Sequence, residues 1–215
     1  MSLILYDYWR SSAAYRVRIA LKLKHIPYES RPVNLLQSEQ LLEEYRTLNP
    51  MQAVPMLDTG THKLTQSIAI MEWLEENYPS PALLPATPEA RAKARAMSLL
   101  VATDIHPLNN QRVLKYLTGP LKQSEEIKQN WYAHWIRQGL TALEAFAKES
   151  AGTYCIGDYV SMADACLIPQ LYSARRFHCP LENYPTLLRI EEACNRLPAF
   201  IGALPEKQVD AVVTP

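Results

Sequence analysis

Cysteine is missing from the first half of the chain. The only four cysteines stand at positions 155, 166, 179 and 194 of the 215 residues. Their spacing matches neither a CxxC pair nor a zinc-binding pattern, so the sequence predicts no metal site. Four isolated cysteines in a reducing compartment are expected to be small buried apolar residues. Chemistry in the first half that needs a thiol must therefore take it from elsewhere.

Long apolar stretches and an excess of either charge are also missing. No apolar stretch approaches the ~20 residues that a membrane helix needs, and the N-terminus lacks the features of a secretory signal. We therefore expect a cytoplasmic protein with no membrane partner. Because 22 basic residues balance 22 acidic ones, no general attraction to nucleic acid is expected either.

The first eighty residues alternate between strand and helix signals. Strands are predicted at 3–8, 28–33, 54–58 and 63–65, and helices after Ser11-Ser12 and at 39–48 and 66–78. This order predicts an α/β domain over residues 1–80, with a mixed sheet covered by helices. Four prolines between 79 and 88 exclude a continuous helix, and we interpret this stretch as a linker.

Strand signals almost vanish beyond the linker, which predicts an all-α domain over residues 88–210. Helical patterns run over 89–117, with one interruption at Pro107, and over 124–150. Ser161 and Asp164 have capping-box spacing before an apolar run. The polar tail after Pro205 is expected to be frayed.

Ser11-Ser12 stands where a strand gives way to a helix. Amide groups at such a start, together with the helix dipole and a hydroxyl donor, make a bound thiol more acidic. The thiolate is the nucleophile, and the first half has no cysteine to provide it. The alternative is an ordinary helix cap without a ligand.

Two other pairs have the same two interpretations. Val54-Pro55 enters a predicted strand from a loop. It is either an ordinary turn or a turn that presents backbone groups to a ligand. Gln66-Ser67 opens a helix, and it is either a cap or a site for a carboxylate. For Gln66-Ser67 the two interpretations are compatible, because a bound anion completes a helix cap.

The segment from Trp9 to Leu21, WRSSAAYRVRIAL, resembles the zeta class of the glutathione transferases, whose motif reads Ser-Ser-Cys-x-x-Arg-Val-Arg-Ile-Ala-Leu. The resemblance continues at 48–51, 66–70, 83–85, 157–158, 162–164 and 167–170. It implies a thioredoxin-like N-terminal domain, an all-α C-terminal domain, a cis Val54–Pro55 bond, glutathione as cofactor and a homodimer. The glutathione-binding residues that it implies in the first half are Ser11, Ser12, Gln40, Val54, Gln66 and Ser67.

One position departs from the motif, since Ala13 stands where the family has cysteine. The segment 104–112, DIHPLNNQR, resembles the maleylpyruvate isomerase segment Asp-Ile-His-Pro-x-Asn-Asn-x-Arg. This likeness implies that His106 and Asn110 contact glutathione and that Arg112 faces the substrate. Arg10 and Arg176 match two further substrate-facing arginines. Without the resemblance, His106 would be interpreted as a histidine at a helix end, and Arg112 and Arg176 as solvated or paired residues at helix surfaces.

The resemblance implies a glutathione-dependent cis–trans isomerase of maleylacetoacetate or maleylpyruvate. Ser11 is expected to stabilise the glutathione thiolate, while Arg10, Arg112 and Arg176 hold a small dicarboxylate substrate in a cleft between the two halves. One alternative is a general transferase or an enzyme that dehalogenates α-haloacids. Another is a non-catalytic binding protein on the same fold.

Overall fold

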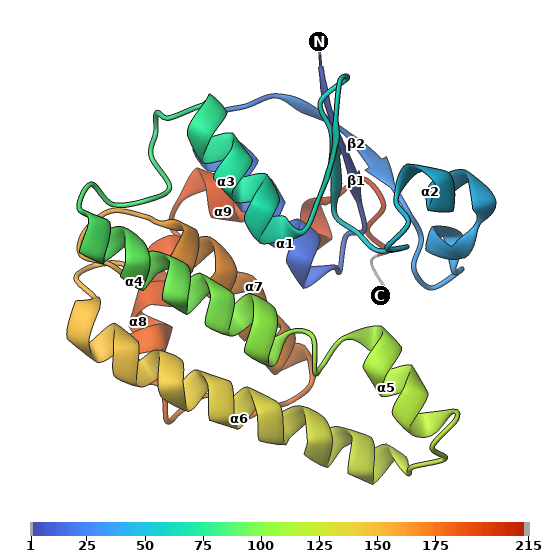
Figure 1. The fold of residues 1–215 in the computed structure, drawn as a ribbon. Helices are drawn as coiled ribbons and strands as arrows, with labels where there is room; N and C mark the ends of the chain where they lie inside the picture. Colours follow the sequence, from blue (N-terminus) through green and yellow to red (C-terminus); the bar gives the residue numbers. More distant parts are fainter. Residues whose placement is uncertain (1, 213–215) are drawn as a thin grey trace. The chain divides into compact units, whose positions relative to one another are not determined.

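The computed structural model describes residues 2–212. These residues form two compact units, one made of the residues up to Leu83 together with those from Asn195 onward, and one made of Leu84–Cys194. In chain order the elements are β1 (Leu3–Asp7), α1 (Ser12–Leu23), β2 (Tyr28–Pro32), η1 (Glu39–Leu41), α2 (Glu43–Leu48), β3 (Met56–Asp58), β4 (Lys63–Thr65), α3 (Ser67–Asn77), α4 (Pro88–Leu99), η2 (Leu100–Ile105), α5 (Gln111–Thr118), α6 (Glu125–Ser150), α7 (Met162–Arg176), α8 (Pro185–Cys194), α9 (Pro198–Ala203) and η3 (Pro205–Lys207) (Figure 1).

The first unit is built on a four-stranded mixed sheet in the order β2-β1-β3-β4. β1 is parallel to β2 and antiparallel to β3, and β3 is antiparallel to β4. Leu3 and Leu5 of β1 are buried at alternate positions, as the period of a strand requires. α1 packs against both α3 and α9. This is the mixed α/β sheet that the order of elements predicts, in the thioredoxin-like architecture that the resemblance implies.

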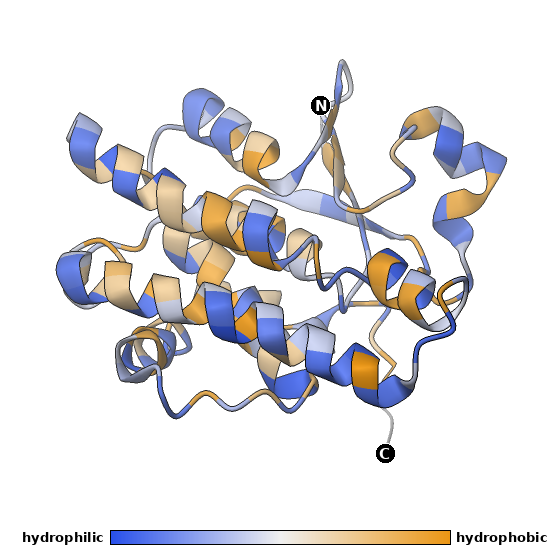
Figure 2. Ribbon diagram, turned by 60° about the horizontal axis from the view of Figure 1, so that its bottom comes forward, coloured by the Kyte–Doolittle hydropathy of each residue, from blue (hydrophilic) through white to orange (hydrophobic). Residues whose placement is uncertain are grey.

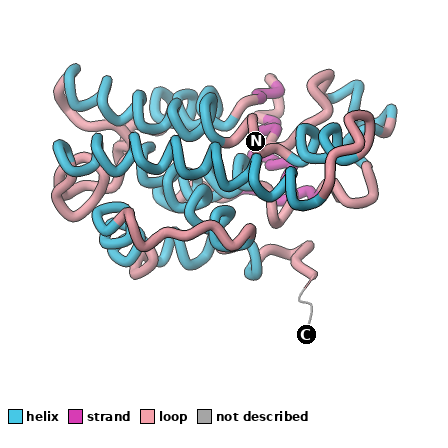
Figure 3. The backbone as a smooth tube through the Cα atoms, turned by 90° about the horizontal axis from the view of Figure 1, so that it is seen from below, coloured by secondary structure: helices cyan, strands magenta, loops and turns pink. Residues whose placement is uncertain are grey.

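The second unit is helical, and the tube drawing shows the strands confined to one part of the chain (Figure 3). α7 is buried along most of its length and packs against α4 and α8, while α6 packs against α5 and α8. Apolar and polar residues alternate along α5 and α6, which leaves one side of each helix for the core (Figure 2). Among residues 2–212, no helix combines the length and apolar character needed to cross a bilayer.

Two predicted helices are interrupted in the structure. The helix expected over 39–48 is divided into η1 and α2, because Leu42 has an extended backbone with φ −67° and ψ 148°. The helix expected over 89–117 contains a longer break than Pro107 alone predicts. It passes from α4 into the π-helical turn η2, and α5 begins only after its cap, Asn110.

The expectation that the tail after Pro205 is frayed is wrong for the described residues. η3 follows α9, and the side-chain amide of Gln208 donates to the carbonyl of Leu204 at 2.6 Å. Asp210 then accepts a hydrogen bond from the backbone of Trp9 at 3.0 Å. The chain from Asn195 onward thus groups with the first unit, whereas the predicted domain 88–210 included these residues. The assignment of residues 1–80 to glutathione and of 88–210 to the substrate stays a prediction.

Candidate active site

The strand register brings the candidate residues of the first unit to one edge of the sheet. Met56 of β3 pairs with Tyr6 of β1 on one side and with Thr65 of β4 on the other. Next to them, Asp7 pairs with Pro32 at the end of β2. The chain therefore leaves or enters the sheet at this edge in four segments, which carry Ser11 and Ser12, Gln40, Val54-Pro55, and Gln66-Ser67.

Ser11 is the N-cap of α1. Its backbone is extended, and its Oγ accepts a hydrogen bond of 3.2 Å from the amide of Ala14. A hydroxyl has one donor and two acceptor positions, so the proton of Ser11 is left for a further partner. Ser12 begins the helix, and no acidic residue in the first turn offsets the positive end of the dipole. The helix start is therefore suited to an anion such as a thiolate.

The turn before β3 has the geometry that the resemblance implies, because the Val54–Pro55 peptide bond is cis. Val54 is buried in an apolar cluster with Tyr8 and Trp9 of the loop after β1. The preceding carbonyl, that of Ala53, accepts hydrogen bonds of 2.7 Å from the hydroxyl of Tyr45 and from the side chain of Asn49. These two residues shape the turn, a role that no motif around them indicates.

Gln66 precedes α3, and its backbone has φ 67° and ψ 116°. A residue other than glycine seldom has a positive φ, which costs of order 1–3 kcal/mol and is concentrated at functional sites. Ser67 is the first helical residue, and its Oγ accepts a hydrogen bond of 3.2 Å from the buried Arg16. The start of α3 thus lies beside a buried cation, which favours a carboxylate ligand.

Gln40 lies in η1, on the segment that follows β2. Its side-chain Oε1 is buried and has no hydrogen-bond partner within residues 2–212. A buried acceptor without a donor is costly, so a ligand that donates to it gains affinity. Within the described residues, no group of three or more His, Cys, Asp or Glu side chains is arranged to hold a metal ion.

In the second unit, the predicted residues His106 and Asn110 lie on the loop between η2 and α5. Asn110 caps α5 through a hydrogen bond of 3.0 Å from the amide of Arg112 to its Oδ1. The loop is held to α6 at two points. The indole of Trp131 donates to the carbonyl of Leu108 at 2.8 Å, and the side chain of Asn109 donates to the carbonyl of Tyr132 at 3.2 Å.

The two predicted arginines of this unit are exposed and lie on different helices. Arg112 is on α5, and Arg176 is the last residue of α7. The Arg176 guanidinium carbon lies 4.9 Å from the centre of the Phe177 ring, which stacks on Tyr132 at 3.9 Å. Tyr132 therefore contacts both the loop that carries His106 and the residue next to Arg176. The remaining predicted arginine, Arg10, is half-buried in the first unit with its guanidinium carbon 4.5 Å from the Trp9 ring centre.

The cysteines are poorly suited to catalysis. All four are buried, and none forms a disulfide within residues 2–212. Burial, reinforced by the nearby carboxylate of Asp164, raises the pKa of the Cys155 thiol well above its usual value. Burial also raises the pKa of Cys179 to about 11 and that of Cys194 beyond its usual range. A thiol with a raised pKa forms little thiolate at neutral pH, so the chain provides no good sulfur nucleophile of its own.

A thioredoxin-like unit with two anion-favouring helix starts at one sheet edge, joined to a helical unit, is the architecture of the glutathione transferases. Residues 1–76 match the family model for the glutathione S-transferase N-terminal domain. A probable maleylacetoacetate isomerase of Vibrio cholerae serotype O1 is 49% identical over 213 residues, which cover 98% of this chain and 99% of that protein.

Two solved proteins are similar over almost the whole chain. A maleylpyruvate isomerase, described as a bacterial glutathione transferase of the zeta class, has a TM-score of 0.95 at 45% identity and covers 97% of this chain and 100% of its own. A maleylacetoacetate isomerase from Anaeromyxobacter dehalogenans 2CP-1, with glutathione bound in its active site, has a TM-score of 0.90 at 45% identity over 98% of both chains. The chain belongs to the zeta-class glutathione transferases, the family of the maleylacetoacetate and maleylpyruvate isomerases.

Proposed function

We propose that this protein is a glutathione-dependent cis–trans isomerase that acts on maleylacetoacetate or maleylpyruvate. One observation carries the proposal. The register of β1, β3 and β4 gathers Ser11, Val54-Pro55 and Gln66-Ser67 at one edge, while every cysteine of the chain is buried. A site built for a thiolate in a chain without a usable thiol needs an external one, and glutathione provides it. Relatives with this activity in their names, one with bound glutathione, support the same assignment.

The first unit is proposed to bind and activate glutathione. The γ-glutamyl carboxylate is placed at the start of α3, where Ser67 and Arg16 lie, and the cysteinyl backbone pairs with Val54. Gln40 accepts a donor of the tripeptide. The thiolate lies at the start of α1 and accepts a hydrogen bond from the Ser11 hydroxyl. Donors fixed before the reaction stabilise such a charge without reorganising.

The reaction is proposed to proceed by addition and elimination. The thiolate sulfur forms a bond to one carbon of the cis double bond, and the electron pair of that double bond moves into the conjugated carbonyl as an enolate. The former double bond is then single and rotates. The enolate electrons return, the carbon–sulfur bond breaks, and the trans product and the glutathione thiolate are released. Arg10, Arg112 and Arg176 are proposed to bind the carboxylates and the enolate oxygen, with His106 and Asn110 contacting glutathione.

Ala13 occupies the position of the family cysteine as the second residue of α1. A methyl group at this position cannot ionise or form a bond to the substrate. The proposed chemistry therefore depends on the Ser11 hydroxyl and the glutathione sulfur, with no contribution from a protein thiol.

We also propose that the protein is a cytoplasmic homodimer. Four cysteines that form no disulfide within residues 2–212 suit a reducing compartment. Large apolar side chains are exposed around α2 of the first unit, including Leu41 at 56%, Leu42 at 55% and Met51 at 51%. Light scattering after size exclusion tests the dimer, and Met51→Glu is expected to shift the mass toward that of one chain if this surface is the interface. A native protein with the mass of a single chain would disprove the dimer.

The activity is tested with maleylpyruvate and maleylacetoacetate in the presence of glutathione, with the trans product followed by a coupled hydrolase. Ser11→Ala removes both the helix cap and the hydroxyl, and the loss of one such donor lowers kcat by about 100-fold or more. Ser11→Thr keeps both functions and serves as the matched control. A rate no higher than that of glutathione alone would disprove the isomerase, and a Ser11→Ala enzyme with the native rate would disprove the role of the serine.

A further inference from the structure

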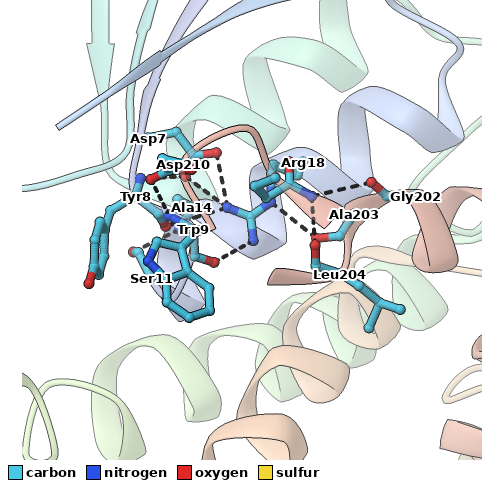
Figure 4. A network of polar contacts seen from close by, with 11 residues as sticks. Asp7, Tyr8, Trp9, Ser11, Ala14, Arg18, Gly202, Ala203, Leu204 and Asp210 are labelled. Carbon is cyan, nitrogen blue, oxygen red and sulfur yellow. Dashed lines mark hydrogen bonds and ion pairs between the residues drawn. The ribbon is translucent and has the colours of Figure 1, made fainter. Parts of the chain in front are cut away.

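The backbone that leads to Ser11 is held almost entirely by charged side chains and by its own turn (Figure 4). The amide of Tyr8 donates to Asp7 at 2.6 Å, and the carbonyl of Tyr8 accepts from the amide of Ser11 at 2.8 Å. The amide of Trp9 donates to Asp210 at 3.0 Å, and the carbonyl of Trp9 accepts from Arg18 at 3.0 Å. Each polar backbone group of the two residues that follow β1 thus has a defined partner.

Arg18 connects three parts of the first unit. It is fully buried, and its Nη1 lies 2.8 and 2.9 Å from the two carboxylate oxygens of Asp7. Its Nε donates to the carbonyl of Ala203, the last residue of α9, at 3.1 Å. A buried ion pair is weak evidence for stability, because the loss of hydration offsets much of the attraction. Its geometry is more informative here, since it joins β1, the loop before Ser11 and the C-terminal segment.

Asp210 is the unexpected member of this group. The Asp7 carboxylate already neutralises Arg18, so Asp210 places a second carboxylate near a single guanidinium. The two carboxyl groups repel each other: burial raises the pKa of Asp7, Arg18 opposes this shift, and the charge of Asp210 adds to it. General charge attraction therefore does not explain an acid at this position. What Asp210 contributes is a directed, charge-assisted hydrogen bond to one amide, two residues before Ser11.

The tail that carries Asp210 is itself fixed. Gln208 donates to the carbonyls of Leu204 at 2.6 Å and Gly202 at 3.3 Å, and Ala211 packs against the apolar cluster that contains Tyr8 and Trp9. A fixed acceptor can hold the loop in one position, which a frayed tail could not do.

We propose that Asp210 is a positioning residue for the Ser11 hydroxyl. By holding the amide of Trp9, it fixes the loop from which Ser11 points to the thiolate. The inference rests on the proposed function, because it assigns to Asp210 an effect on the glutathione thiol. Displacing a reacting group by about 1 Å can lower a rate by roughly 100-fold, so a distant hydrogen bond can affect the chemistry strongly.

The test compares Asp210→Ala, Asp210→Asn and the neighbouring control Val209→Ala, whose side chain is 82% exposed in the native protein. Three quantities are measured for each: kcat, the affinity for glutathione, and the pKa of the bound glutathione thiol from the ultraviolet absorbance of its thiolate. Asp210→Ala is expected to lower kcat about tenfold, the effect of roughly 1.4 kcal/mol on a barrier, and to raise the thiol pKa. Asp210→Asn should restore both, because its amide oxygen accepts the same hydrogen bond.

Two results would overturn the proposal. One is an Asp210→Ala enzyme with the native kcat and thiol pKa. The other is a lower kcat with an unchanged thiol pKa and no rescue by Asp210→Asn, which would indicate a structural role only. The native protein is titrated first. If it shows no thiolate signal with glutathione, the proposed function itself is wrong, and this outcome is seen before any variant is compared.

Discussion

Arg16 of α1 donates a 3.2 Å hydrogen bond to the side chain of Ser67, the first residue of α3. Both side chains are buried, with Arg16 only 1% exposed. The helix start that is proposed to activate the thiol and the helix start that is proposed to bind the γ-glutamyl carboxylate are therefore joined by one buried contact. The proposed carboxylate site at the start of α3 is therefore in direct contact with the helix that begins after Ser11.

Ser67→Ala is expected to weaken glutathione binding about tenfold or more. The substitution removes a hydrogen bond to a charged group, which contributes roughly 1.5–3 kcal/mol, and it leaves Arg16 without this partner. Titration calorimetry with glutathione measures the effect, and Thr61→Ala in the exposed turn between β3 and β4 is the matched control. Equal affinities for the native protein and Ser67→Ala would show that this serine is not part of the glutathione site.

The local parts of the site were predictable from the sequence. The Val54–Pro55 bond is cis, as the family resemblance implies. From the residues alone, Ser11 caps α1 as predicted, and the capping box at Ser161 and Asp164 is present. These features depend on residues a few positions apart, where the chemistry of the backbone determines the outcome. The alternation of strands and helices likewise predicted the α/β unit and the helical unit, and the family resemblance implied that the first is thioredoxin-like.

The long-range parts were not predictable. Asp210 is 201 residues from Trp9, and nothing in a polar tail indicates that one of its carboxylates returns to the first loop. Arg16 and Arg18 did offer a signal that remained unused. They stand within a run of apolar residues on α1, and arginines are almost never fully buried unless they are paired. Buried partners for both could have been expected, but only the structure identifies Ser67 and Asp7.

Arg176→Ala is expected to raise the KM for the dicarboxylate by about 10- to 100-fold, as for the loss of a charged partner, and to leave glutathione affinity unchanged. The guanidinium lies beside Phe177, whose ring stacks on Tyr132. Arg176→Lys should restore only part of the effect, because an ammonium group cannot form a bidentate contact with a carboxylate. Steady-state kinetics with each substrate varied in turn separate the two constants.

The neighbouring residue offers a matched control for this prediction. Arg175 is also exposed at the end of α7, and it forms an ion pair with Glu191. Arg175→Ala removes the same charge one position away, so it should change the KM little. If both substitutions raised the KM equally, the effect would come from the overall charge and not from a contact between Arg176 and the substrate.

The native enzyme is expected to resist thiol-alkylating reagents. A thiol with a pKa of about 11, as burial gives Cys179, has only about 0.1% thiolate at pH 8, and the thiolate is the reactive form. Because the pKa is raised, reactivity should increase only as the pH approaches this value. The protein is treated with iodoacetamide without glutathione, the reagent is removed, and activity and mass are measured. Rapid labelling of one cysteine with loss of activity would contradict the proposed dependence on glutathione sulfur. Denatured protein is the control, and it should label at all four cysteines.

Asp164→Ala is expected to destabilise the protein by about 2–4 kcal/mol, because it removes a capping interaction and leaves buried donors without an acceptor. The carboxylate accepts from the amide of Cys155 at 2.8 Å and from the amide and hydroxyl of Ser161 at 2.8 and 2.9 Å. Urea unfolding measures the loss. Asp158→Ala is the control, since within residues 2–212 this exposed carboxylate accepts only from Thr153 and should have a much smaller effect.

The difference in unfolding free energy between the native protein and Asp164→Ala should depend on pH, and this dependence tests the environment of Asp164 separately. Burial raises the pKa of Asp164 in the folded state above its unfolded value of 3.8, although the hydrogen bonds from Cys155 and Ser161 oppose the shift. A raised folded pKa means that the folded state binds the proton more tightly than the unfolded chain does. The stabilisation by Asp164 relative to alanine is therefore greatest below the unfolded pKa and decreases as the pH rises through the folded pKa. Unfolding free energies of the native protein and Asp164→Ala, measured from pH 4 to pH 7, should converge as the pH rises. A difference that grows with pH would show that the three hydrogen bonds outweigh desolvation and lower the pKa instead.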